Sequence, residues 1–248
     1  MILNSESHLD KENLVPKSRR TKSQDFELKH MELMKERQLN LEEALCNHYF
    51  GAEVRRKLVD WVVEVLHIFK SSERTLFLCC KLVDICICRG EGLMPRDLHL
   101  LGVSAMFISS KYEDLKPLSL TDIYYRVVHK KFSKALILEM ERKILKCVEY
   151  SVYIPTLYDH LEGILHQEAE VTKKQAWFLA NVSLLSCELC SVPSWRVAEA
   201  ILIYTNKKDF PTVGPLALCL QTLQSTLENY KYQSTFTGIA LKHVIFNN

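Results

Sequence analysis

Apolar residues recur at intervals of three and four along most of the chain after Asp25. One series, with steps of 4, 3, 4 and 4, consists of Val54, Leu58, Trp61, Val65 and Phe69. A second, with steps of 3, 4, 3 and 4, consists of Leu98, Leu101, Ala105, Ile108 and Tyr112. Both match the turn of an α-helix. No stretch alternates strictly between apolar and polar residues with hairpin turns at its ends, so the sequence predicts an all-α fold.

Helix-start and helix-stop signals divide this pattern into short helices. Pro95 opens the segment that ends near Leu115, and Gly90 and Gly92 end the segment before it. Three residue pairs have the spacing of reciprocal N-terminal caps: Ser119 and Asp122, Thr156 and Asp159, and Thr172 and Gln175.

The signals predict four regions. Residues 1–24 are polar and lack apolar periodicity, which is typical of a disordered tail. Residues 25–50 are predicted to hold an N-terminal helix and a linker. A boundary near Pro155 leaves residues 51–153 and 154–248, each of ordinary domain size and each with about five helices.

The segment from Leu98 to Ser110 differs from the other predicted helices because it contains no charged residue and several small ones. A helix that is apolar on every side must be surrounded by other helices, and small residues let those helices approach closely. The segment is followed by the polar residues 111–114. We therefore expect a buried rod with a polar tip.

Composition excludes several classes of protein. The chain has 248 residues, 48% of them hydrophobic and 25% charged, and a formal net charge of +2, so general electrostatic binding of nucleic acid is not expected. No apolar run is long enough for a transmembrane span, and we expect no membrane association. The nine cysteines lie mostly in apolar segments and are interpreted as reduced core residues. The single C-x-x-C pair, Cys187 and Cys190, favours core packing over a metal site, and no cofactor is expected.

No catalytic constellation is evident. The chain lacks a glycine-rich phosphate loop and the usual hydrolase and metalloprotease motifs, and its histidines are scattered singly, as at His48, His67 and His129. An enzyme is therefore the weaker hypothesis.

Several carboxylates lie inside apolar helical segments, namely Asp60, Asp84 and Glu141. A carboxylate on an apolar face is costly unless it meets a cation or backbone N–H groups, and Arg55 and Lys111 are candidate cations. From the residues alone, these charges form either internal salt bridges or contacts to a partner protein.

Several segments resemble the cyclin box. Residues 54–65 (VRRKLVDWVVEV) look like its first helix, 101–114 (LGVSAMFISSKYED) its third, and 140–145 (MERKIL) its fifth. Residues 150–156 (YSVYIPT) resemble the exit into the second fold, and 193–200 (PSWRVAEA) the entry into that fold's third helix. The five residue types that mark the box occur in order, as Arg55, Leu58, Asp84, Lys111 and Glu141.

The resemblance implies tandem five-helix cyclin folds and a regulatory subunit that binds and activates a cyclin-dependent serine/threonine kinase. It implies a kinase interface made of Lys111, Glu141, Ile108, Tyr112, Leu145, Tyr150 and Val152. It also implies an internal bridge between Arg55 and Asp84. In such kinases the strand lysine and the helix glutamate must pair before phosphoryl transfer proceeds.

A second implied surface is the family's docking patch for Arg-x-Leu motifs, here Val54, Leu58, Trp61 and Glu64. Two positions depart from the family pattern: Lys57 stands where an aliphatic residue is usual, and His99 replaces a usual glutamine. A lysine removes apolar area and opposes the arginine of the motif, so weak docking is expected.

The tail contains Lys11, Glu12 and Asn13, which resemble the KEN degradation signal of mitotic regulators and imply contact with ubiquitin-ligase machinery. The basic cluster at residues 17–22 is either a nuclear localisation signal or a solvated run, and we expect a protein of the nucleus and cytoplasm.

The leading hypothesis is a mitotic, B-type-like cyclin acting at G2/M. A G1-type cyclin remains an alternative. A transcription-initiation factor with tandem cyclin-like repeats is another, although it needs a basic face and usually a zinc ribbon, and neither is evident in the sequence.

Overall fold

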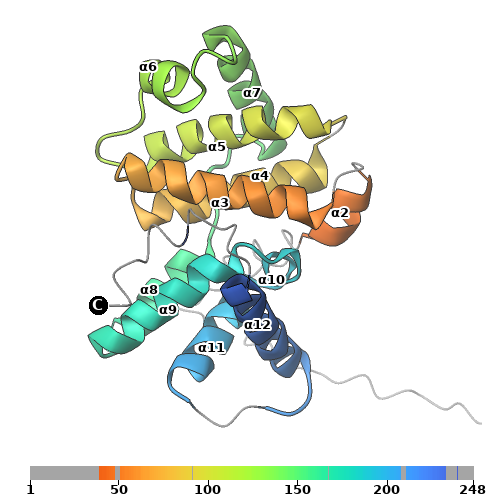
Figure 1. Cartoon of the computed structure of the whole chain (residues 1–248), viewed down its shortest axis with the longest axis vertical. Coiled ribbons are helices and arrows are strands. Elements are labelled where there is room, and N and C mark those ends of the chain that lie inside the picture. Colours follow the sequence, from red (N-terminus) through yellow and green to blue (C-terminus); the bar gives the residue numbers. More distant parts are fainter. Residues whose placement is uncertain are drawn as a thin grey trace, which may run out of the picture. The chain divides into compact units, whose positions relative to one another are not determined.

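The computed structural model describes residues 39–47, 51–90, 92–166, 168–207 and 211–232, together with residue 239. Within these ranges all regular structure is helical, which confirms the predicted all-α fold (Figure 1). The elements are α2 (Leu41–Asn47), α3 (Ala52–Ile68), α4 (Glu73–Arg89), η2 (Pro95–Asp97), α5 (Leu98–Glu113), α6 (Leu120–Asp122), η3 (Ile123–Val127), α7 (Lys134–Cys147), α8 (Leu157–Leu165), α9 (Glu170–Ser183), α10 (Cys187–Ser191), α11 (Ser194–Thr205) and α12 (Pro215–Tyr232).

Helix α5 is the central rod of the first group of helices. It packs against α3, α4 and α7, and its residues 100–110 are all buried, as the uncharged sequence predicts. Gly102 permits the contact with α3, because a Cβ atom there would lie 2.9 Å from Leu58 Cδ1. The small polar residues are satisfied inside the core: Ser104 Oγ donates to the carbonyl of Ile137 on α7 at 3.2 Å.

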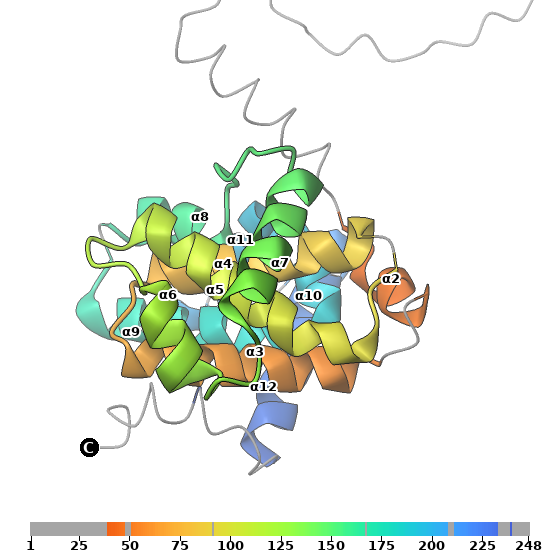
Figure 2. The ribbon, with the colours of Figure 1, turned by 90° about the horizontal axis from the view of Figure 1, so that it is seen from above.

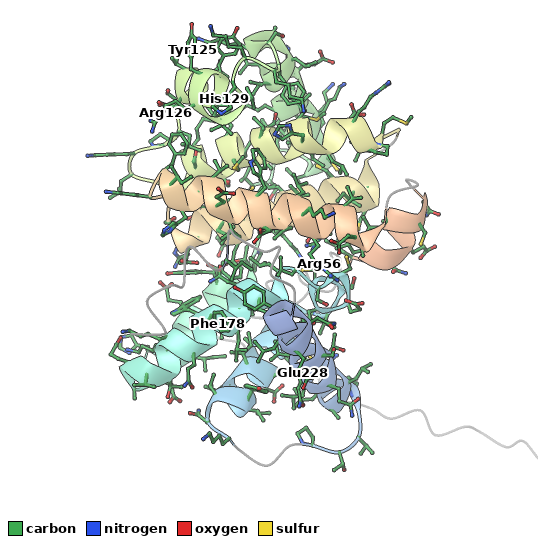
Figure 3. The ribbon with its side chains drawn as sticks, viewed as in Figure 1. Arg56, Tyr125, Arg126, His129, Phe178 and Glu228 are labelled. Carbon is green, nitrogen blue, oxygen red and sulfur yellow. The ribbon has the colours of Figure 1, made fainter. Side chains whose placement is uncertain are left out.

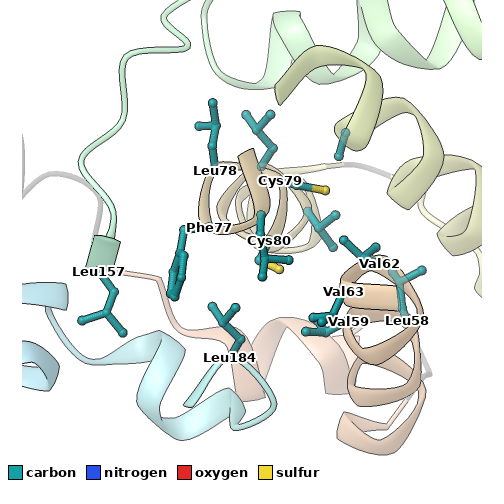
Figure 4. Packing of buried hydrophobic residues seen from close by; sticks show 14 of the residues in the cluster. Leu58, Val59, Val62, Val63, Phe77, Leu78, Cys79, Cys80, Leu157 and Leu184 are labelled. Atoms are coloured by element: carbon teal, nitrogen blue, oxygen red, sulfur yellow. The ribbon is translucent and has the colours of Figure 1, made fainter. Parts of the chain in front are cut away.

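The second group is formed by α8, α9, α11 and α12, with α11 in contact with the other three. Its core joins that of the first group. Figure 4 shows Phe77 of α4 beside Leu157 of α8 and Leu184, which follows α9, and all three side chains are buried. A second connection is made by α2, which packs against both α4 and α10. Apolar contact therefore continues from one group of helices to the other.

Arg74 adds a polar link between the two groups. From the first turn of α4 its Nη1 donates to Asp159 of α8 at 2.9 Å, and it also forms an ion pair with Glu162. Its guanidinium lies 4.7 Å from the ring centroid of Tyr158.

Of the three predicted reciprocal caps, one is present in full and a second in one direction only. Ser119 accepts a hydrogen bond from the backbone of Asp122, and Thr156 and Asp159 form a reciprocal capping box. The prediction at Thr172 is wrong, because α9 begins at Glu170 and Thr172 lies inside its first turn. An acidic residue at the start of a helix is favoured by the helix dipole, and this makes the earlier start favourable. Gly90 follows the last residue of α4 as predicted, and the neighbouring Gly92 has φ of 66°.

Arg55 and Asp84 form a buried, bidentate ion pair between α3 and α4. Arg55 Nε and Nη2 donate to the two carboxylate oxygens of Asp84, each at 2.7 Å, and the arginine is 0% exposed. Arg55 Nη1 also donates to the carbonyl of Leu184 at 2.8 Å, and Nη2 lies 3.2 Å from Cys190 Sγ. Burial alone would lower the pKa of Arg55, but the carboxylate of Asp84 overcomes this and the pKa is raised. One guanidinium thus connects both groups of helices.

The buried carboxylate of Asp60 is also used internally. Its Oδ1 accepts a hydrogen bond from the backbone N–H of Ile239 at 3.1 Å. Asp60 and Asp84 therefore have structural partners within the chain.

No helix in the described ranges combines the length and apolar character that a bilayer crossing requires.

Replacing Asp84 by Asn should destabilise the chain by about 3–5 kcal/mol, because the buried guanidinium of Arg55 loses its counter-charge. Urea unfolding followed by circular dichroism measures this loss. The control is Glu139→Gln, which removes an exposed carboxylate that lies inside α7 and pairs with Lys143 at 3.0 Å, and it should leave the unfolding midpoint unchanged. The double variant Arg55→Met with Asp84→Leu should recover much of the loss, since it leaves no buried charge. An Asp84→Asn variant as stable as the control would contradict a structural role for the pair.

Candidate functional site

Lys111 and Glu141 are brought together by the packing of α5 against α7. Lys111 lies in the last turn of α5 and Glu141 in the middle of α7, and their side chains form an ion pair. The pair is partly open to solvent, with side-chain exposures of 41% for Lys111 and 12% for Glu141. Lys111 Nζ also lies 3.9 Å from the ring centroid of the buried Phe107. The lysine is thus held between a carboxylate and an aromatic face at the surface.

Exposed and half-exposed apolar side chains accompany this pair in the predicted interface. Tyr112 is 50% exposed and Tyr150 is 65% exposed, while Leu145 and Val152 are partly buried. Ile108 is only 4% exposed, so it lies in the core and offers almost no area to a partner. The expectation of a direct contact at Ile108 does not fit this burial, because the uncharged α5 is enclosed by its neighbours up to Ser110.

Tyr150 is placed by a turn that the sequence pattern does not announce. After α7 the chain passes through two residues in the left-handed region, Glu149 with φ of 54° and Tyr150 with φ of 58°. Backbone hydrogen bonds hold this turn, including the N–H of Tyr150 to the carbonyl of Leu145 at 2.7 Å. Such backbone is costly for residues other than glycine and clusters at functional sites. The turn is a feature of this surface that sequence reasoning missed.

The predicted docking patch is only partly a surface. Val54 is exposed, Trp61 and Glu64 are half-buried, and Leu58 is buried against Gly102. Trp61 packs edge-on against His99, with ring centroids 4.6 Å apart. Lys57 is exposed and lies 3.8 Å from Glu53, so its charge stays in solvent beside the patch.

A cavity of about 220 Å³ extends this patch beyond the predicted residues. Trp61 and Glu64 line it together with Phe69, Arg126 and His129. The guanidinium of Arg126 lies 4.5 Å from the ring centroid of Phe69. Figure 3 shows Arg126 and His129 on the segment that follows α6. These residues are far from α3 in the sequence, so no local pattern connects them with the patch.

The cysteines give no sign of a metal centre. Cys187 is buried, and Cys190 is next to Arg55, with its pKa raised by burial. In the part of the chain that the structure describes, no three His, Cys, Asp or Glu side chains are arranged to hold a metal ion. The predicted degradation signal at Lys11, Glu12 and Asn13 and the basic cluster at residues 17–22 lie outside the described residues.

Comparisons with known proteins agree with this geometry. The family described as "Cyclin, N-terminal domain" matches residues 27–153, which are 127 of the 248 residues. The chain is 32% identical over 155 residues to G2/mitotic-specific cyclin-2 of Medicago sativa, covering 61% of this chain and 46% of that protein. It is 31% identical over 179 residues to G2/mitotic-specific cyclin-B3 of Drosophila melanogaster, covering 71% of this chain and 30% of that protein. The matched part is thus less than half the length of these two relatives.

A solved structure shows the same fold. The viral cyclin from herpesvirus saimiri superposes with a TM-score of 0.61 at 16% sequence identity, covering 87% of this chain and 93% of that chain. The family match, the curated relatives and the shared helical architecture lead to one assignment. The chain belongs to the cyclin family and within it is similar to the G2/mitotic-specific cyclins.

Proposed function

We propose that this chain is the regulatory subunit of a cyclin-dependent serine/threonine kinase, which it binds and activates to control cell-cycle progression at G2/M. In this proposal the chain carries out no bond-making itself. Membership of the cyclin family and the names of the G2/mitotic-specific relatives support it. The same names favour G2/M over the G1 alternative.

The observation that carries the proposal is the partly exposed Lys111–Glu141 pair at the end of α5, where the exposed Tyr112 follows Lys111 in the sequence. An ammonium group has three donors and a carboxylate several acceptor positions, so each can keep its partner and still bind a backbone group of another protein. Exposed aromatic side chains together with polar anchors are typical of an interaction surface. Tyr112 and Tyr150 supply those aromatic side chains here.

The surface is suited to activation because it is rigid. Lys111 belongs to a helix whose preceding eleven residues are buried, and α7 is packed against that helix. A rigid surface that binds only the kinase conformation with its lysine–glutamate pair formed shifts the population toward that conformation. To convert a 1:99 equilibrium into 99:1, it must bind the active state about 10⁴-fold more tightly.

The double variant Lys111→Ala with Glu141→Ala should abolish kinase activation and leave the helical content near that of the parent chain. The reason is that it removes both polar anchors at a partly exposed site, where an ion pair contributes little to folding. Co-purification with the kinase and a phosphorylation assay measure the loss. Glu170→Ala with Lys173→Ala, which removes another exposed pair, is the matched control and should activate normally. Unchanged activation by the Lys111/Glu141 variant discards this interface.

An Arg-x-Leu peptide should bind the docking patch weakly, because Lys57 beside the patch and Arg126 in its cavity both oppose the arginine of the motif. Replacing Lys57 by Leu should tighten binding about tenfold, since it adds apolar area and removes one positive charge. Titration followed by fluorescence anisotropy measures both affinities. Tight binding to the parent chain, or no gain in the Lys57→Leu variant, is the contrary result.

Alanine at positions Lys11, Glu12 and Asn13 should lengthen the lifetime of the protein at mitotic exit, if this tripeptide is recognised by ubiquitin-ligase machinery as we propose. Decay after release of synchronised cells from mitotic arrest measures the lifetime. A variant with alanine at Leu14, Val15 and Pro16 controls for a general effect of altering the tail. If the variant with alanine at positions 11–13 and the parent chain decay at the same rate, the predicted degradation signal is wrong.

A further inference from the structure

A cavity of about 970 Å³ lies where the end of α4, the start of α5 and one side of α7 meet. These three helices, labelled in Figures 1 and 2, are mutually in contact. The volume is at the upper end of the range found for ligand sites. Neither the Lys111–Glu141 pair nor any residue of the predicted docking patch lines this groove.

The floor of the groove is apolar. Leu100, Leu101, Met140 and Ile144 are buried in it. Leu136 stands at its edge and is 38% exposed. Leu93 and Phe132 are partly buried and complete the apolar lining. The groove can therefore accept several apolar side chains.

The rim of the groove is strongly basic. Five cationic side chains line it: Arg89, Arg96, Lys131, Lys143 and Lys146. The only carboxylate among the described lining residues is Asp97, and it accepts a hydrogen bond from the backbone N–H of Met94 at 3.0 Å. Lys143 pairs with Glu139 at 3.0 Å, whereas Arg96 and Lys146 are exposed and form no ion pair with any described residue. Among its described residues, the rim thus carries five cations and one carboxylate.

We propose that this groove binds a short acidic segment of a partner protein, whose apolar side chains enter the floor while flanking carboxylates pair with the rim. Charge complementarity selects this occupant, because the cations come from four separate segments: α4, η2, the turn before α7, and α7 itself. An anion with a single head group would meet only part of that rim. The acidic segment is opposite in charge to an Arg-x-Leu motif. Its binding to the groove does not depend on kinase binding.

The probe is a fluorescein-labelled peptide, Gly-Asp-Glu-Leu-Asp-Asp-Phe-Leu-Glu-Asp-Gly, titrated with the full chain and followed by anisotropy. Saturable binding that weakens as salt is added is expected. A peptide with every Asp changed to Asn and every Glu to Gln should bind at least about tenfold more weakly. Failure of the acidic peptide to bind, or equal binding of the neutral peptide, overturns the proposal.

Two matched pairs of variants locate the binding. Arg96→Glu with Lys146→Glu should weaken the acidic peptide about tenfold, whereas Lys116→Glu with Lys174→Glu makes the same charge change on exposed residues outside the groove and should not. Leu136→Gln should weaken binding, whereas Leu138→Gln, on the same helix and 37% exposed, should not. Circular dichroism verifies that all four are folded. Equal affinities within either pair overturn the proposal.

Dodecanoate tests the other occupant, a lipid-like anion. If dodecanoate displaces the labelled acidic peptide only at concentrations far above that of the peptide, the peptide assignment is supported. If dodecanoate binds more tightly than the acidic peptide, and Lys146→Glu removes that binding, the groove is a lipid site and the proposal is wrong.

Discussion

The ion pair between Arg55 and Asp84 is the interaction on which the arrangement of helices depends. Arg55 of α3 is wholly buried, and its guanidinium contacts Asp84 of α4 and the carbonyl of Leu184 beyond α9. A charge in that position is tolerated only because each of its contacts is in place, so the pair specifies one mutual placement of these segments. Apolar contacts such as Phe77 with Leu157 and Leu184 provide favourable burial, but they are not directional. The hydrogen bonds of the Arg55–Asp84 pair are directional, and they fix how the segments are oriented.

The proposed function depends on the side chains that this packing leaves at the surface. Residues 100–110 of helix α5 are buried, and its last turn reaches solvent, where Lys111 meets Glu141 from α7. The left-handed turn at Glu149 and Tyr150 then carries an aromatic ring to the exterior. Because these groups come from packed helices and a hydrogen-bonded turn, they are arranged before a partner arrives, and less conformational entropy is lost on binding. A regulatory subunit that acts by selecting one conformation of another protein requires this rigidity.

The helices, two of their caps and the two ion pairs could be predicted from the sequence, because their signals lie in short segments or in family motifs. The absence of charge from Leu98 to Ser110 predicted the buried helix, and spacing predicted the caps at Ser119 and Thr156. The family resemblance named Lys111 with Glu141 and Arg55 with Asp84, and the structure brings both pairs together. What could not be predicted depends on packing between distant residues: the contact of Arg55 with Leu184, the burial of Ile108, and Arg126 beside Trp61. The turn at Glu149 and Tyr150 could not be predicted, because neither residue is a glycine, the residue that usually signals a left-handed backbone.

The central claim is that the ends of α5 and α7 form a preorganised surface for a kinase. Amide hydrogen exchange on the full chain, alone and saturated with a recombinant cyclin-dependent kinase, tests it most directly. The account predicts slow exchange in the buried part of α5 already in the free chain, and new protection on binding at the last turn of α5, along α7 and around Tyr150. New protection confined to α9, α11 and α12, or α5 becoming ordered only in the complex, would contradict it.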